Sequence, residues 1–181
     1  MSDTAAIVRR AFEQGLVVPA FNVPYLPMVE PVVRAVADCE SFGLIETARL
    51  EWYKFEGKGL GPVKHEYDKW ARPEVRLHLD HVPVIDEDDQ RVDYRAIIGE
   101  ALSLGYESVM VDGSRLSLDE NIEVTREAAQ LAHDAAVPCE AELGAVLGHE
   151  AGPPPPYEEV FASGRGFTDG AEARRLVCAS G

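Results

Sequence analysis

The sequence lacks the features that mark disulfide-rich, membrane-spanning or nucleic-acid-binding proteins. Its three cysteines, Cys39, Cys139 and Cys178, are far apart and odd in number, which argues against a disulfide framework and a CxxC metal motif. No apolar run is long enough to span a bilayer, and residues 1–15 carry charges where a signal peptide has its apolar segment. Basic residues are scarce: 17 Lys and Arg against 32 Asp and Glu give a net charge of −15, which disfavours nucleic acid and membranes as partners. We therefore expect a cytoplasmic protein with reduced, mostly buried thiols.

The 181 residues suffice for one domain with a substantial core, and strand and helix patterns alternate along them. Short apolar runs predict strands over residues 16–23, 44–48, 75–81, 107–114 and 138–143. Amphipathic patterns predict helices over residues 3–14, 27–42, 62–70 and 119–135, a helix ending at 104, and a last helix with Thr168 as its N-cap. This alternation, at roughly thirty residues, is typical of βα units on a parallel sheet.

Five such units are compatible with two architectures. One is a doubly wound sheet, and the other is part of a (β/α)₈ barrel. A whole barrel takes about 250 residues. At the observed spacing of the βα units, this chain is too short for eight of them. The alternation alone leaves both architectures open.

Polar residues gather at the predicted strand ends, where buried parallel strands are otherwise nearly all apolar. These residues are Asn22, Asp80, His81, Asp112, Glu140 and Glu142. In a barrel the carboxyl ends of all strands converge on one mouth, which is where active sites lie. An Asp, a His, a second Asp and a Glu at one mouth form a composition typical of a divalent-metal site.

Each of these residues also has a purely structural explanation, and a lone histidine at a strand end is usually structural. Alternation places His78 and Asp80 on one face and His81 on the other, unless the strand ends at Asp80 and turns both Asp80 and His81 toward the mouth. Glu140 and Glu142 share one face, which a buried strand tolerates poorly without a cation or hydrogen-bond donors. This pair of acids favours a functional site.

Five segments, in order, carry a resemblance to a known family. They are Ala20-Phe21-Asn22-Val23, His78-Leu79-Asp80-His81, Ser108 to Ser114, Asp119-Glu120-Asn121 and Glu140-Ala141-Glu142-Leu143-Gly144. Together they resemble the class II, metal-dependent fructose-bisphosphate aldolases, including tagatose-bisphosphate aldolases, from about residue 11 to residue 177. The resemblance implies an α/β fold, a partial (β/α)₈ TIM barrel with about five βα units after an N-terminal helix. Residues 1–181 would then be the N-terminal part of a single barrel domain.

The resemblance implies a role for each matching residue. Asp80 matches the acid/base that exchanges a proton with the substrate hydroxyl, and Glu150 fits an acid on the loop after the fifth strand. Asn22 matches a substrate-binding position. His81 matches a zinc ligand, and Asp112 and Glu142 match acids at a second or displaced metal position. The implied cofactor is Zn²⁺, with room for a second divalent or monovalent cation.

The implied function is that of a lyase of carbohydrate metabolism, such as glycolysis, which cleaves or forms a ketose bisphosphate by aldol chemistry. In the family, two further zinc-binding histidines and glycine-rich phosphate loops come after the part that matches this chain. We therefore expect a truncated aldolase that forms homo-oligomers or self-associates through unpaired strand edges. The acidic stretch 84–92 and the segment 47–49, which lacks a serine, depart from the family and leave the sugar phosphate open. Two alternatives remain: a metal-dependent sugar-phosphate isomerase, and a non-catalytic aldolase fragment that needs a partner.

Overall fold

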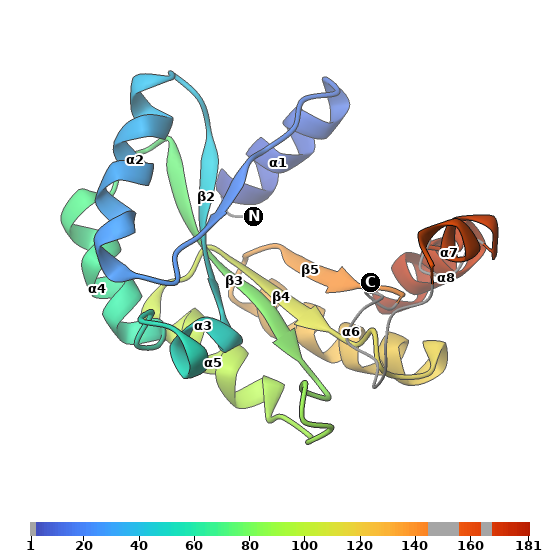
Figure 1. Cartoon of the computed structure of the whole chain (residues 1–181). Helices are drawn as coiled ribbons and strands as arrows, with labels where there is room; N and C mark the ends of the chain where they lie inside the picture. The colour runs from blue at the N-terminus through green and yellow to red at the C-terminus, as the bar shows by residue number, and fades with distance from the viewer. Residues whose placement is uncertain (1–2, 145–155, 164–167) are drawn as a thin grey trace.

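A parallel sheet with the strand order β1-β2-β3-β4-β5 forms the centre of the computed structural model, which describes residues 3–144, 156–163 and 168–181 (Figure 1). The strands are β1 (Ala20–Asn22), β2 (Gly43–Ala48), β3 (Val75–Pro83), β4 (Ser108–Asp112) and β5 (Cys139–Glu142). Each strand pairs in parallel with the strand before it along the chain. A doubly wound sheet reverses its order at a switch point, whereas an unbroken sequential order is that of a barrel wall. The predicted partial barrel with five βα units is confirmed.

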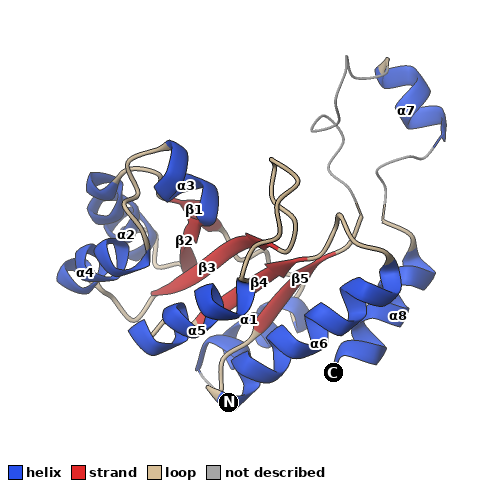
Figure 2. Ribbon diagram, turned by 90° about the horizontal axis from the view of Figure 1, so that it is seen from below, coloured by secondary structure: helices blue, strands red, loops and turns tan. Residues whose placement is uncertain are grey.

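Helices precede, connect and follow the strands, and several of them cover the outer side of the curved sheet. They are α1 (Asp3–Glu13), the 3₁₀ helix η1 (Leu26–Met28), α2 (Val29–Asp38), α3 (Arg49–Lys54), α4 (Leu60–Trp70), α5 (Tyr94–Leu104), α6 (Leu118–Asp134), α7 (Tyr157–Ser163) and α8 (Gly170–Ser180). Figures 1 and 2 show α2, α4, α5 and α6 along this outer side. No helix in the described ranges is long and apolar enough to cross a membrane.

The hydrophobic core lies between the sheet and the outer helices. Alternate strand side chains, such as Ile45, Leu77 and Val109, are completely buried and pack with helix residues such as Val33 and Ile98. Because successive side chains of a strand point to opposite faces, the residues between them face the other way.

The inner face of the sheet is polar. Glu46 on β2 is in register with His78 on β3, which is in register with Ser108 on β4. At the carboxyl ends, Asp112 on β4 is in register with Glu142 on β5. The polar residues of the sequence pattern therefore share one face, which corresponds to the inside of a barrel.

Two helices and one helix cap differ from the prediction. Helices α3 and α7 lie outside the segments that we predicted to be helical; α3 begins directly after β2, where the Ala48 N–H donates to Glu51 Oε2 at 2.8 Å. The predicted cap Thr168 is wrong, because the Asp169 carboxylate accepts hydrogen bonds from the free N–H groups of Ala171 and Glu172 at 2.8 and 3.0 Å. An ionised carboxylate is a stronger acceptor for these groups than a hydroxyl.

The cysteines are unpaired, as predicted, but the expectation that they are mostly buried is wrong. Cys39 and Cys178 are exposed and Cys139 is half-buried. Cys39 directly follows the last turn of α2, where the chain leaves the core. Cys178 lies on α8, whose buried side is marked by Leu176.

Candidate metal and acid/base site

A bulge in β3 brings Asp80 and His81 to the same face of the sheet. Leu79 pairs with Val109 and Val82 pairs with Val111, so two residues of β3 lie opposite one residue of β4. His81 takes up the difference with a left-handed backbone, φ 46°. This conformation costs a residue with a side chain about 1–2 kcal/mol, the kind of strain that collects at functional sites. The strand does not end at Asp80 or His81, as the sequence suggested, but continues to Pro83, and the bulge turns His81 inward.

His81 lies between two carboxylates from neighbouring strands. Its Nδ1 is 3.7 Å from Asp112 Oδ2, and its Nε2 is 3.4 Å from Glu142 Oε2. The side chain of Asp112 is 7% exposed and that of His81 is 50% exposed, so the group opens to solvent on one side. Burial and the charge of Asp112 raise the pKa of Glu142, while the nearby His81 opposes that rise. We call His81, Asp112 and Glu142 the outer group.

The donor atoms of the outer group fit a divalent metal ion. One ligand atom from each residue can be chosen so that all three lie within 4.8 Å of one another. One imidazole nitrogen and two carboxylate oxygens are a ligand set that zinc accepts, and three protein ligands leave a position for water or substrate. His81, Asp112 and Glu142 therefore suit the metal that the sequence suggested.

Asn121, on α6, fixes the carboxyl ends of β4 and β5. Its Nδ2 donates to the Glu142 carbonyl at 2.9 Å, and its Oδ1 accepts from Thr125 Oγ1 at 3.1 Å. The backbone at Gly113 passes so close that an added Cβ would collide with Asn121 Oδ1. The Ser114 N–H donates to Asp112 Oδ1 at 2.8 Å, which leaves Oδ2 facing His81. The sequence pattern assigned no role to Asn121; its only signal was an asparagine on the helix that follows Asp112-Gly113.

Asp80 is held from the first strand of the sheet. Asn22 Nδ2 donates to Asp80 Oδ2 at 2.9 Å, although β2 separates the two strands. The residue of β2 in register with Asp80 is Ala48, whose small side chain leaves room for this contact. One carboxylate oxygen of Asp80 thus has a fixed partner on the described chain.

A second polar group lies deeper on the inner face, and the sequence analysis missed its glutamate. Burial, followed by the charges of Asp80, Glu140 and Glu51, raises the pKa of Glu46 to about 7. Burial lowers the pKa of His78 to about 4, so this imidazole is neutral at pH 7. Glu46 gave no signal in the sequence because it lies in the middle of an apolar strand, without a neighbouring motif.

Most of the predicted site residues come together. His81, Asp112 and Glu142 form one group, and Asn22 contacts Asp80, which directly precedes His81. Glu150 lies outside the described residues. The chemical roles of these residues stay predictions.

Comparison with known proteins identifies the relatives of this chain. The family model "Fructose-bisphosphate aldolase class-II" matches residues 2–181. A fructose-bisphosphate aldolase of Helicobacter pylori is 31% identical over 146 residues, which cover 80% of this chain and 44% of that protein. A probable fructose-bisphosphate aldolase of Bacillus subtilis is 29% identical over 176 residues, covering 94% of this chain and 55% of that protein.

Solved structures of aldolases have a similar fold. The YdjI aldolase of Escherichia coli K12 superposes with a TM-score of 0.71 at 25% identity, over 99% of this chain and 61% of that one. A fructose-bisphosphate aldolase of Campylobacter jejuni superposes with a TM-score of 0.61 at 21% identity, over 79% of this chain and 46% of that one. The chain thus spans about half the length of the curated relatives it matches.

Proposed function

Because the chain belongs to the class II fructose-bisphosphate aldolase family, we propose that it carries the acid/base and part of the metal site of an enzyme that cleaves or forms a ketose bisphosphate. The substrate is a phosphorylated sugar, and residues 1–181 are the N-terminal part of one barrel domain. The observation that carries this proposal is the bulge at Asp80-His81, which presents a carboxylate and an imidazole side by side to the inner face. We also expect a cytoplasmic location, which the unpaired cysteines support.

Asp80 is the group that moves a proton. Aldol cleavage requires a base that removes the hydroxyl proton beside the breaking carbon–carbon bond, and condensation requires the same group to return it. Asn22 holds Oδ2 of Asp80, so Oδ1 is the oxygen left for the substrate proton. Fixing the carboxylate in this way orients the base before substrate arrives, which lowers the cost of positioning it during the reaction.

The outer group is where a metal ion would bind. His81, Asp112 and Glu142 would hold it, and a bound Zn²⁺ would act as a Lewis acid for the negative charge that develops on the ketone fragment. Asn121 keeps Glu142 and Asp112 at a constant separation by fixing the backbone at both strand ends. The neighbouring positions of Asp80 and His81 in the chain place the proton-transfer group beside the metal ligand.

A cleavage assay tests this function. The purified chain, mixed with the C-terminal half of a relative's barrel and supplied with Zn²⁺ and fructose 1,6-bisphosphate, should release triose phosphate, measured by a coupled loss of NADH absorbance. Asp80→Asn should lower the rate by about 10²–10⁴-fold, the range for loss of a general base. Glu123→Gln, which changes an exposed acid on α6, should have the wild-type rate.

Each other result counts against the proposal. Conversion of the sugar phosphate to an isomer without triose phosphate would favour the isomerase alternative. Turnover that needs the C-terminal half of a relative but does not depend on Asp80 of this chain would favour the non-catalytic fragment. An Asp80→Asn chain with the wild-type rate would remove Asp80 from the mechanism.

A further inference from the structure

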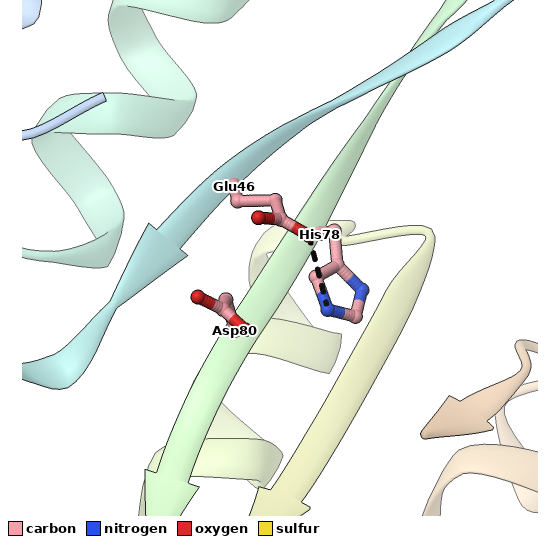
Figure 3. Close-up of side chains that lie close together, drawn as sticks. All are labelled: Glu46, His78 and Asp80. Atoms are coloured by element: carbon pink, nitrogen blue, oxygen red, sulfur yellow. Dashed lines mark ion pairs between the residues drawn. The ribbon is translucent and has the colours of Figure 1, made fainter. Parts of the chain in front are cut away.

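A second set of ligand atoms lies on the inner face of the sheet, deeper than the outer group. Glu46 comes from β2, and His78 and Asp80 come from β3 (Figure 3). Glu46 and His78 are in register on adjacent strands, and Asp80 lies two residues further on the same face. One ligand atom from each residue can be chosen so that all three lie within 4.8 Å of one another. We call Glu46, His78 and Asp80 the inner group.

His78 is buried in this group without a hydrogen-bond partner. Its side chain is 1% exposed, and no described residue forms a hydrogen bond with either ring nitrogen. A buried polar group without a partner costs about 1–3 kcal/mol, so native structures nearly always satisfy it. The imidazole therefore needs a ligand on the inner face, where one ring nitrogen points toward the Glu46 carboxylate (Figure 3).

The distances around His78 suit a shared metal ion better than direct hydrogen bonds. Its Nε2 is 4.0 Å from Glu46 Oε1 and 3.7 Å from Glu140 Oε2. Both separations exceed a hydrogen bond. Two ligand atoms about 2.0–2.2 Å from one tetrahedral zinc ion lie roughly 3.3–3.6 Å apart, so a small contraction would close the group around an ion.

The charges around His78 also favour a bound metal ion. The carboxylates of Glu46, Asp80 and Glu140 face one another around a neutral ring, with Glu51 of α3 close by, and no lysine or arginine is paired with Glu46 in the described part of the chain. The side chain of Glu46 is 13% exposed and that of Glu140 is 59% exposed, and a cation between carboxylates this close together would relieve their mutual repulsion. An imidazole nitrogen with two carboxylate oxygens selects a first-row divalent ion over Ca²⁺ or Mg²⁺, which prefer all-oxygen sites.

We propose that Glu46, His78 and Asp80 form an inner site for a first-row divalent metal ion, distinct from the outer group of His81, Asp112 and Glu142. The inner site needs only β2 and β3, whereas the outer group needs β3, β4 and β5. Asp80 joins the inner site through its carboxylate, so an inner ion competes with proton transfer by this residue. Metal binding at the inner site does not depend on the aldolase reaction.

The number of bound ions tests the inference directly. The full chain is freed of metal with a chelator and titrated with Co²⁺, with bound metal measured by equilibrium dialysis and elemental analysis. The wild type should bind two ions per chain. Glu46→Gln and His78→Gln should each bind one, His81→Gln should bind one, and the double variant His78→Gln/His81→Gln should bind none. His65→Gln, an exposed histidine on α4, is the matched control and should bind two.

A spectroscopic measurement separates loss of the site from misfolding. In the Co²⁺-loaded His81→Gln chain, the ring protons of one histidine should show large paramagnetic shifts, and these should vanish with the additional change His78→Gln. The proposal is wrong if the wild type binds no ion, or if the single ion that it binds is lost in His81→Gln and kept in His78→Gln. It is equally wrong if His78→Gln and Glu46→Gln still bind two, or if His81→Gln has no shifted histidine signal.

Discussion

Asn22 and Asp80 are joined by a hydrogen bond of 2.9 Å that crosses an intervening strand. The contact runs diagonally across β2, where Glu46 is in register with Asn22 and Ala48 with Asp80, and so ties β1 to β3 at one end of the sheet. The sequence analysis gave Asn22 a substrate-binding role. In the structure its amide nitrogen donates to Asp80, the base that we propose, and this contact leads to the first prediction.

Replacing Asn22 by Ala should lower the turnover number rather than weaken substrate binding. A hydrogen bond to a charged group contributes about 1.5–3 kcal/mol, and 1.4 kcal/mol corresponds to tenfold, so we expect kcat to fall about 10–100-fold. The KM and the ion bound at the outer group should change little. Steady-state kinetics and metal analysis measure both; a raised KM with an unchanged kcat would instead support a role in substrate binding alone.

Removing the metal should abolish cleavage, and the loss should depend on His81. Dialysis against a chelator should lower activity to background, and added Zn²⁺ or Co²⁺ should restore it. His81→Ala should not recover, because catalytic zinc commonly requires three protein ligands and this change leaves two in the outer group. Activity that survives chelation would contradict the metal-dependent mechanism.

Gly113→Ala should destabilise the chain through a collision with Asn121. The added methyl group would strike Asn121 Oδ1, and overpacking of this kind costs about 1–3 kcal/mol. Gly99→Ala is the matched control: its added Cβ meets nothing within 4 Å, so this change inside α5 should stabilise by about 0.5–1 kcal/mol. Urea unfolding measures both variants.

A double-mutant cycle sharpens this test. Asn121→Ala alone should cost about 1–3 kcal/mol, because it leaves the Glu142 carbonyl without its donor. Combined with Gly113→Ala, the total should be less than the sum, since the small side chain removes the collision. Additive effects would show that Gly113 and Asn121 do not interact as the structure places them.

Three buried tyrosines should make the chain sensitive to alkali. Burial raises the pKa of Tyr94 to about 12, and it raises the pKa values of Tyr67 and Tyr106 even further. Between pH 10 and pH 12 the unfolded chain loses these protons and the folded chain keeps them, so the free energy of unfolding falls as pH rises. The slope should be about 1.4 kcal/mol per pH unit for each tyrosine.

Tyrosinate absorbance in the near ultraviolet, measured together with circular dichroism as the pH is raised, checks this prediction. Ionisation of the buried tyrosines should coincide with loss of secondary structure. Tyr106→Phe should reduce the slope by about one third, although it also removes the hydrogen bond to the Leu60 carbonyl. If all tyrosines ionise while the chain is still folded, Tyr67, Tyr94 and Tyr106 are not buried as the structure shows.

The chain should self-associate through the region around β1. Val17 is 90% exposed and Phe12 is 83% exposed, and β1 pairs only with β2 among the described strands. Apolar surface beside an unpaired strand edge favours contact with another chain. Val17→Glu should shift sedimentation toward the monomer, while Val177→Glu on α8 should not; a monodisperse wild-type monomer would rule the association out.

Much of the fold could be predicted from the sequence, because alternation of apolar runs and amphipathic stretches reports directly on burial. The strand ends carrying Asp112 and Glu142 were predicted for the same reason: acids are conspicuous in buried strands. The bulge at His81 was not predictable, since a left-handed histidine follows from pairing with β4 and not from local preference. Glu46 was missed because its importance depends on His78, more than thirty residues away.

The sequential strand order has a consequence for how the chain is made. Each strand pairs with the strand synthesised just before it, so every unit can add to a wall already in place as the chain leaves the ribosome. The inner group is brought together when β3 pairs with β2, whereas the outer group waits for Glu142 on β5. The two groups therefore assemble at different times, and the strained backbone of His81 is fixed only after β4, the strand that follows it in the chain, has paired with β3.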